Sequence, residues 1–562
     1  MKKTIKITIY ALLVFFASCK KDFLKEEPIG FLSTANGLVT YNDFNEAAND
    51  MYRVVRTEFY TRDENYPFDY LYSTDLVYDG QASTYRHTNL LATFAPSGGN
   101  NIPLTHWSAL YKLVSEANVI ITRVPSANLT DSQKTLLVAK AKFFRAFGYR
   151  SLAYLYGGVP LSLEEVTTPK TDYVRAARHE VYEQCIADLK DAVAGLPNIG
   201  AVMDGEVNAQ AAGHLLAEVY LADGQFQNSV DAATSVISSP LVSLMTKRFG
   251  SGATNANGNV YWDLFQPGNQ NRKSGNLEGL WVIQIETDVP GGSAVSTAQA
   301  GSYLLERQHA PYVGLLLSTG ANSSKPADPF LWPFDNNSGG RGIGWAISTK
   351  HFSDDIWQSD FNNDIRNANI NFVRVFTSNN PASAFYGQQI SVSNPPPGIT
   401  APSRGFYAYE AKCSPPGSHP ANLFANGTSG GLLKSTAGGT YTDQYMFRLA
   451  ETYLIRAEAY LGLNDKEDAA KDLNTVRNRS NASDVLPANV NIDYILDERM
   501  RELGVEEKRM LTLCRLGLVY DRVKRFNPYY SDISETYNLW PIPADEIERN
   551  KDAVLTQNPG YQ

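Results

Sequence analysis

Seven histidines and several adjacent acids are the residues of this sequence whose types suit acid–base or metal chemistry. No histidine has a second one at i+4, the spacing of a zinc-binding helix, and no nucleophile elbow, Cys-x-x-Cys pair or phosphate loop occurs. A glycosidase needs two carboxyl groups ~5–9 Å apart across a cleft, whereas acids are mostly exposed, so we expect solvated faces. These residues are His87, His106, His179, His214, His309, His351 and His419, with Asp354-Asp355, Glu164-Glu165 and Glu506-Glu507.

Cys19 is the residue for which the surrounding sequence predicts a covalent modification. Three lysines begin the chain, an apolar run covers 5–16, and the small residues Ala17-Ser18 precede Cys19, the order of an export signal. The run is shorter than the ~20 residues that span a bilayer, and the charged residues 20–22 argue against an N-terminal core helix. The segment resembles a lipobox, with Phe16 in place of the usual Leu. We therefore expect cleavage after residue 18 and a lipid anchor on Cys19.

Composition indicates an ordinary globular protein with a large core. The chain has 562 residues, 43% of them hydrophobic, and a net charge of −9 that becomes −12 once the three signal lysines are removed. This acidity argues against nucleic acid or an anionic lipid face as a ligand. The three other cysteines, Cys185, Cys413 and Cys514, are scattered and odd in number, so we expect buried thiols rather than disulfides.

Amphipathic helical spacing covers two blocks of the chain, roughly 42–240 and 441–520. One unit occurs in both: Ala217-Glu218-x-Tyr220-Leu221 recurs as Ala457-Glu458-x-Tyr460-Leu461, each followed by a polar turn and a second apolar helix. This pattern is typical of tetratricopeptide-like helical hairpins, which must stack to bury their apolar faces. Two looser hairpins are His106–Val124 with Gln133–Tyr156, and Ala177–Leu196 with Gly205–Leu221.

The intervening residues are rich in Gly, Asn, Ser and Pro and contain only short β-like runs, at 281–285, 372–376 and 406–409. The Gly-rich series 339–344 has neither a preceding strand nor a following helix, so we expect a loop. The sequence thus predicts a mainly α protein with a tetratricopeptide-like scaffold and a large loop-rich insert. The expected segments are 1–18 signal peptide, 19–41 lipidated N-terminal segment, 42–240 first helical block, 241–440 insert lobe and 441–562 helical block completing the scaffold.

Short motifs follow one another in a characteristic order along nearly the whole chain. They are Cys19-Lys20-Lys21-Asp22-Phe23-Leu24 with Pro28, Trp107-x-x-Leu110-Tyr111 with Ala117-Asn118, Phe144-Arg145-Ala146, Tyr154-Leu155-Tyr156-Gly157-Gly158-Val159-Pro160-Leu161, Asp364-x-Arg366, Glu498-Arg499-x-x-Glu502-Leu503, Trp540-Pro541-Ile542-Pro543 and Gln557-Asn558-Pro559-Gly560-Tyr561. In this order and spacing the chain resembles the SusD/RagB family of outer-membrane nutrient-binding lipoproteins from Bacteroidetes.

The resemblance implies a non-enzymatic, SusD-like lipoprotein on the outer face of the cell outer membrane that serves polysaccharide utilization. The scaffold would pack on a SusC-like TonB-dependent transporter, and the opposite, loop-rich face would bind a glycan for nutrient uptake. No cofactor is implied, and no EF-hand series predicts calcium, although a structural Ca²⁺ is left open. Arg145, Glu498 and Arg499 are expected to form ion pairs within the helical blocks rather than a site.

A glycan site needs exposed aromatic planes flanked by amides, carboxylates or arginine. In the family such residues come from the loop after the first helix, here 66–88, and from the insert. We favour Trp332, because the sequence 329–333 followed by polar residues suggests an exposed loop tip. The other candidates are Tyr85, Arg86, Asp75, Tyr72, Tyr66 and Asn336, while Trp107, Trp262, Trp281 and Trp540 are expected in the core or scaffold and Trp345 and Trp357 stay open.

Two other functions remain open from the sequence. In the first, the same fold captures peptides or glycopeptides. Its pocket would have fewer stacking aromatics and more hydrogen-bond donors directed at the backbone of the bound peptide. In the second, the protein is an exported helical glycoside hydrolase whose carboxyl pair the sequence does not disclose.

Overall fold

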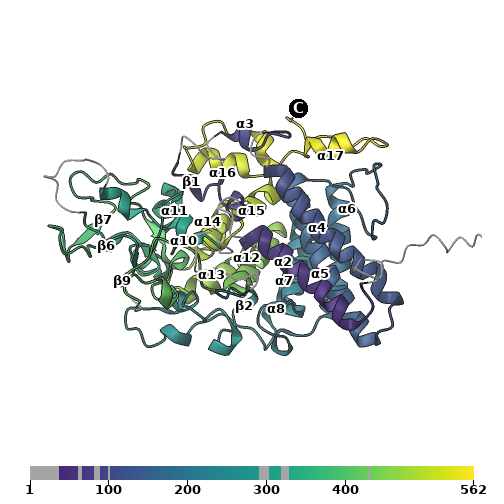
Figure 1. Cartoon of the computed structure of the whole chain (residues 1–562), viewed down its shortest axis with the longest axis horizontal. Coiled ribbons are helices and arrows are strands. Elements are labelled where there is room, and N and C mark those ends of the chain that lie inside the picture. Colours follow the sequence, from purple (N-terminus) through teal and green to yellow (C-terminus); the bar gives the residue numbers. More distant parts are fainter. Residues whose placement is uncertain are drawn as a thin grey trace, which may run out of the picture.

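The computed structural model describes residues 37–60, 66–81, 89–98, 102–289, 303–317, 328–427 and 431–561. The export signal, Cys19, Tyr85 and Arg86 lie outside these residues. Within the described ranges no helix is both long and apolar enough to cross a membrane. Figure 1 shows a block of long helices beside a lobe of loops and short strands.

Long helices form the first block, and neighbours along the chain pack against one another. Capping begins several of them: Thr130 and Gln133 form a capping box at the start of α5, and Asn208 accepts from the Ala211 amide at the start of α7. The second half of α5 is buried on all sides, so this helix is the centre of the block. The helices are α2 (Tyr41–Tyr60), α4 (Ile102–Arg123), α5 (Asp131–Tyr156), α6 (Arg178–Gly195), α7 (Ala209–Ala222) and α8 (Phe226–Ile237).

The two copies of the repeated unit stack directly, as predicted. The α7–α8 hairpin packs against the hairpin of α12 (Leu449–Gly462) and α13 (Lys466–Arg479) through α8 and α12. Gly224 and Asn464 occupy equivalent positions in the turns of the two hairpins. Both have a positive φ, 72° and 61°, which glycine and asparagine tolerate. The shared apolar cluster consists of Ala217, Leu221, Val230, Ala233, Ile455 and Ala459. Both looser hairpins are also confirmed, by α4 against α5 and α6 against α7.

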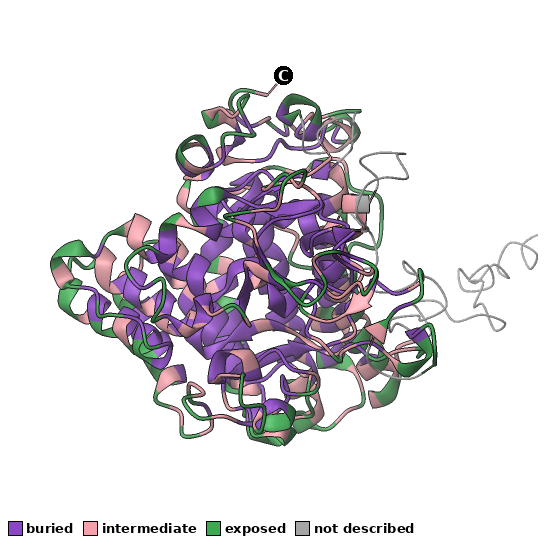
Figure 2. Ribbon diagram, turned by 90° about the vertical axis from the view of Figure 1, so that its left-hand side faces the viewer, coloured by how far each residue is buried: buried purple, intermediate pink, exposed green. Residues whose placement is uncertain are grey.

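The chain closes with α14 (Ile492–Glu502), α15 (Arg509–Leu516), α16 (Val519–Phe526) and α17 (Ala544–Arg549). Of these, α15 packs on α5 in the helical block. Figure 2 shows buried residues in the middle of the molecule and exposed residues on its rim. The predicted ion pairs are confirmed in this interior, as are the three buried thiols. The pairs are Arg145–Asp188 at 2.7 Å, Glu498–Arg477 at 2.8 Å and Arg499–Glu451 at 2.6 Å.

The short strands pair antiparallel in twos, and two of the pairs join a strand of the insert to one outside it. The predicted runs at 281–285 and 372–376 contain strands, whereas of the run 406–409 only Tyr409 belongs to one. The insert has, in its described part, aromatic packing of its own, for example between Phe376 and Phe406 at 5.0 Å and between Trp357 and Phe372 at 5.8 Å. It is therefore ordered there. The pairs are β1 (Val77–Asp79) with β4 (Ala346–Ser348), β2 (Gly279–Ile283) with β10 (Gln444–Arg448), β3 (Phe334–Asp335) with β9 (Gly431–Leu432), β5 (Phe372–Val373) with β8 (Tyr409–Glu410), and β6 (Val375–Thr377) with β7 (Gln389–Ser391).

Candidate ligand site

The pairing of β1 with β4 joins the segment after the first helix to the insert lobe. Tyr78 lies opposite Ile347 in this pair, and just beyond it the Gly80 amide donates to the Trp345 carbonyl at 2.7 Å. A Cβ on Gly80 would lie 2.4 Å from the Gly344 carbonyl oxygen, so the close approach requires glycine. The two regions from which the sequence drew its ligand candidates are therefore neighbours in the fold.

Three aromatic rings and three guanidinium groups gather beside this junction. The Tyr312 and Trp332 ring centroids are 4.5 Å apart. The Arg404 guanidinium carbon lies 5.5 Å from the Tyr312 ring and 5.9 Å from the Trp345 ring, distances of cation–π contacts. We call this group the aromatic–arginine cluster; its members are Gln81, Arg307, Tyr312, Trp332, Arg341, Trp345 and Arg404.

The backbone positions the cluster through a ladder between two stretches of the insert. The amides of Ile343 and Trp345 donate to the carbonyls of Arg307 and Gln308, both at 2.9 Å. Arg307 belongs to the short helix α10 (Leu305–His309), which lies in the middle of the lobe in Figure 1. The ladder places Trp345 beneath the Arg307 side chain, whose guanidinium carbon is 5.3 Å from the ring.

Hydrogen bonds fix the polar edges of the cluster. Gln81, with its amide assigned from its neighbours, accepts from the Trp345 indole N–H at 2.6 Å and from Arg404 at 2.7 Å. Arg404 Nε also donates to the Ile343 carbonyl at 2.6 Å. Aromatic planes with arginine donors beside them match a ligand that has both apolar faces and hydroxyl groups. A sugar ring is such a ligand.

Buried charged residues contact the backbone of the cluster. Arg341 donates its amide to Glu306 Oε1 at 2.9 Å, and His419 lies between Glu306 at 3.1 Å and Asp335 at 3.2 Å. Burial alone would lower the pKa of His419, but the two carboxylates outweigh it and raise the pKa to about 10. A protonated His419 therefore ties α10 to β3, the strand that follows Trp332.

Trp332, the favoured candidate, belongs to the cluster, but it is half-buried rather than at an exposed loop tip. Its indole N–H donates to the Gly342 carbonyl at 3.2 Å. The ring also lies against Gly314, where a Cβ would come within 2.9 Å of it. The loop folds back because Tyr312 and Gly314 offer the indole a surface, a non-local contact that the local sequence does not reveal.

Asp75 lies in the core, which corrects the expectation that this carboxylate meets a ligand. It is fully buried, and its oxygens accept from Arg509 at 2.8 Å and from Arg522 at 2.7 Å. Burial would raise the pKa of Asp75, but the two guanidinium groups hold it well below its usual range. Tyr72 is likewise interior, since its hydroxyl donates to Gln308 Oε1 at 2.7 Å.

Two further candidates, Tyr66 and Asn336, make other contacts. Tyr66 is half-buried with its ring edge-on to His106, away from the cluster's aromatic contacts. Asn336 Oδ1 accepts from the Ser338 amide at 2.8 Å, so this side chain shapes the turn after β3. Tyr85 and Arg86 follow Gln81 within a few residues but lie outside the described residues.

The sequence identified only one aromatic of the cluster in advance. Tyr312, Arg307, Arg341, Arg404 and Gln81 were missed, because the contacts that join them are between residues distant in the chain. Arg341 carried a weak signal, as the charged residue of a glycine-rich loop. Of the undecided tryptophans, Trp345 joins the cluster and Trp357 is core, while Trp107, Trp281 and Trp540 are buried and Trp262 is half-buried.

In each adjacent pair at least one acid forms an ion pair with a basic side chain, whereas Glu164 lines a hollow of about 270 Å³ whose lining also includes Glu546. Glu165 accepts from Arg123 at 2.6 Å, Glu506 from Arg448 at 3.0 Å, and Asp355 from Lys350. Among the described residues no group of three or more His, Cys, Asp or Glu side chains could hold a metal ion.

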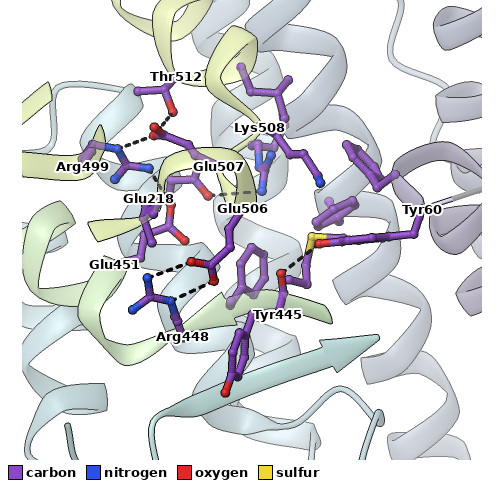
Figure 3. A pocket seen from close by; sticks show the side chains of 17 residues that line it. Tyr60, Glu218, Tyr445, Arg448, Glu451, Arg499, Glu506, Glu507, Lys508 and Thr512 are labelled. Atoms are coloured by element: carbon purple, nitrogen blue, oxygen red, sulfur yellow. Dashed lines mark hydrogen bonds and ion pairs between the residues drawn. The ribbon is translucent and has the colours of Figure 1, made fainter. Parts of the chain in front are cut away.

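An interior cavity of about 50 Å³ between the helical block and α15 is lined by charged residues, as Figure 3 shows. It has room for a few water molecules only. In the figure Lys508 points toward Tyr60, and Nζ is 4.2 Å from that ring centroid. Burial lowers the pKa of Lys508 to about 7 against the opposing effect of Glu506. We interpret this cavity as part of the packed interior, not as a site for a glycan.

Comparisons with known proteins agree with this fold. Residues 336–561 match the model of the SusD family, and 34–221 match a model described as starch-binding, associating with outer membrane. The chain is 24% identical to SusD-like protein P2 of Formosa agariphila over the full length of both. It is 33% identical over 141 residues to the starch-binding protein SusD of Bacteroides thetaiotaomicron. This aligned stretch covers 23% of this chain and 24% of that protein.

Solved structures give the same result. A laminarin-binding SusD-like protein superimposes with a TM-score of 0.67 over 92% of this chain and 99% of its own, at 21% identity. Surface glycan-binding protein A of Bacteroides thetaiotaomicron gives 0.65 over 92% and 100%, at 19% identity. The architecture is thus the SusD-like fold. The chain belongs to the SusD/RagB family, whose members are binding proteins and not enzymes.

Proposed function

We propose that this protein is a cell-surface lipoprotein that captures glycans and passes them to a SusC-like TonB-dependent transporter. The observation that carries the proposal is the aromatic–arginine cluster. In it Trp332 and Tyr312 are half-buried, so each residue is partly exposed, while Trp345 is buried. Such partly exposed planes stack on the C–H faces of sugar rings, and arginine N–H groups donate to hydroxyl oxygens.

The ligands named for two relatives support a polysaccharide as the ligand of this protein. One relative in structure binds laminarin and one relative in sequence binds starch, both neutral glucans. The linkage that this protein reads depends on its own loops. We therefore take laminarin and starch as the first two ligands to test, beside other plant, algal and microbial polysaccharides.

Binding without turnover is the expected behaviour. The purified protein should migrate more slowly in affinity gels that contain its glycan, and binding should release heat in isothermal titration. The mixture of protein and glycan should gain no reducing ends. If no glycan binds and peptides do, the ligand class in the proposal is wrong. New reducing ends would instead favour the hydrolase.

The transporter partnership has its own test. Extraction of membranes in mild detergent, followed by capture of tagged protein, should bring down a large TonB-dependent outer-membrane transporter. The matched control is the same protein with Cys19→Ala, expressed in the same cells and captured from the soluble fraction. Isolation of the wild-type protein alone under every mild condition would contradict this part of the proposal.

A further inference from the structure

A hollow of the described chain lies outside the aromatic–arginine cluster and is built around Trp262. Its volume is about 400 Å³, within the ~300–1,000 Å³ of small-molecule sites. The Trp262 side chain is half-buried, and its indole N–H makes no hydrogen bond with the described residues. Thr254, Asn255, Gln266 and Pro416 surround it.

Two glycines let the chain pack closely against this indole. A Cβ on Gly252 would lie 2.4 Å from Cζ3 of Trp262, and one on Gly258 would lie 2.7 Å from Cε3. The loop backbone therefore contacts the benzene part of the indole and fixes the ring. The Asn259 side chain accepts from the Trp262 amide at 2.9 Å and fixes the backbone as well.

Arg248 holds the loop in shape from inside. Its guanidinium donates to the carbonyls of Gly252 at 2.6 Å, Asn255 at 3.0 Å and Gly258 at 2.8 Å. It also pairs with the fully buried Asp263 at 2.6 Å. Charge-assisted bonds to three carbonyls and one carboxylate make the loop rigid, so the hollow is formed before a ligand arrives.

The lining of the hollow is polar but uncharged. Asn255 accepts from the Asn257 amide at 3.0 Å, which orients its side chain, and its NH₂ group makes no hydrogen bond within the described residues. The exposed Thr254 adds a hydroxyl. One aromatic plane with an amide and a hydroxyl at its edge, and no charge, is the chemistry that recognises a neutral sugar residue.

The hollow belongs to the same lobe as the cluster. The Gly417 amide, in the wall beside Pro416, donates to Asp335 Oδ1 at 3.0 Å, and Asp335 belongs to β3, which follows Trp332. We infer that the Trp262 hollow is a second sugar-binding subsite, which takes neutral sugar residues and holds the same polysaccharide chain as the cluster. The inference rests on the proposed function and adds a second point of attachment to it.

Two subsites on one chain predict avidity for polymers. Trp262→Ala should weaken binding of a polysaccharide by about three- to tenfold, the range expected for one lost aromatic contact. Its effect on the affinity of the cluster for a trisaccharide should be small. Trp262→Phe should retain most of the polymer affinity, and Asn255→Ala, at an exposed position, should lower it without touching the fold. Tyr220→Ala in α7 is the matched aromatic control.

Titration of laminarin, starch and their trisaccharides into these variants, with circular dichroism to confirm folding, distinguishes the outcomes. If the wild type binds a polysaccharide and both Trp262→Ala and Asn255→Ala bind it equally well, this inference is overturned and the proposed function is intact. Absence of wild-type binding to every glycan overturns both. A polymer affinity that falls in Trp262→Ala but not in Tyr220→Ala supports the second subsite.

Discussion

Asp75 and Arg509 are 434 residues apart in the chain and form a fully buried ion pair, with Arg509 Nη2 2.8 Å from Asp75 Oδ2. Arg522 contacts the same carboxylate at 2.7 Å. The segment after the first helix, from which β1 enters the lobe, is thereby fastened to α15 and α16 at the other end of the chain. The pair is a structural contact, not part of a ligand site.

Removal of the Asp75 carboxylate should therefore destabilise the fold. Asp75→Ala removes the carboxylate that Arg509 and Arg522 share and leaves Arg509 with Glu507 and Arg522 with Asp493 and Asp497. Breaking one side of a comparable buried pair costs about 3–5 kcal/mol of unfolding free energy. Asp468→Ala, which removes the exposed partner of Lys471, is the control and should cost under about 1 kcal/mol. Denaturant unfolding measures both. If the Asp75→Ala protein is stable but no longer binds glycan, Asp75 contacts the ligand and our assignment is wrong.

His106 should make stability depend on pH. It is fully buried between Glu58 and Asp69; burial alone would lower its pKa, but the carboxylates raise it to about 9. Because the folded pKa exceeds the unfolded value near 6.5, the stabilisation is complete below pH ~6.5 and is lost as pH rises through about 9. The stability difference between wild type and His106→Gln should thus shrink from pH 6 to pH 9.5. An equal difference at both values would contradict a protonated His106.

Close packing between the two repeated hairpins gives a third prediction. A Cβ on Gly462 at the end of α12 would lie 2.6 Å from the Phe226 ring of α8, so Gly462→Ala should destabilise by about 1–3 kcal/mol. Phe226→Leu in the same chain should recover part of this loss in a double-mutant cycle. Gly200→Ala, where the nearest atom is at 3.8 Å, is the control. Equal midpoints for both glycine variants would show that the hairpins do not pack as described.

Much of the fold was predictable because helices carry their signal locally. The apolar spacing around Ala217 and Ala457 predicted hairpins that stack, and the strand runs near Trp281 and Phe372 are present. The ligand site was less accessible to prediction. Asp75 looked like an exposed acid because its partners are hundreds of residues away, and Tyr312 and Arg404 join Trp332 only through the folded lobe.

Cys19 should anchor the protein without contributing to its fold. Cys19→Ala removes the acylated thiol, so the variant should appear in the soluble fraction, fold normally and bind the same glycan. Cys185→Ala, at a buried thiol, is the control and should stay with the membrane. Membrane fractionation followed by glycan titration checks both points. A Cys19→Ala protein that remains in the membrane would contradict lipid anchoring at this residue.

The central claim, that the aromatic–arginine cluster binds a glycan, is tested most directly by isothermal titration of Trp332→Ala with the glycan that binds the wild type. Trp332→Phe, which keeps an aromatic plane, and Tyr220→Ala, on α7, are measured beside it after their folding is verified. We predict at least about a tenfold loss for Trp332→Ala, partial retention for Trp332→Phe and no change for Tyr220→Ala. A folded Trp332→Ala protein with wild-type affinity would contradict the account.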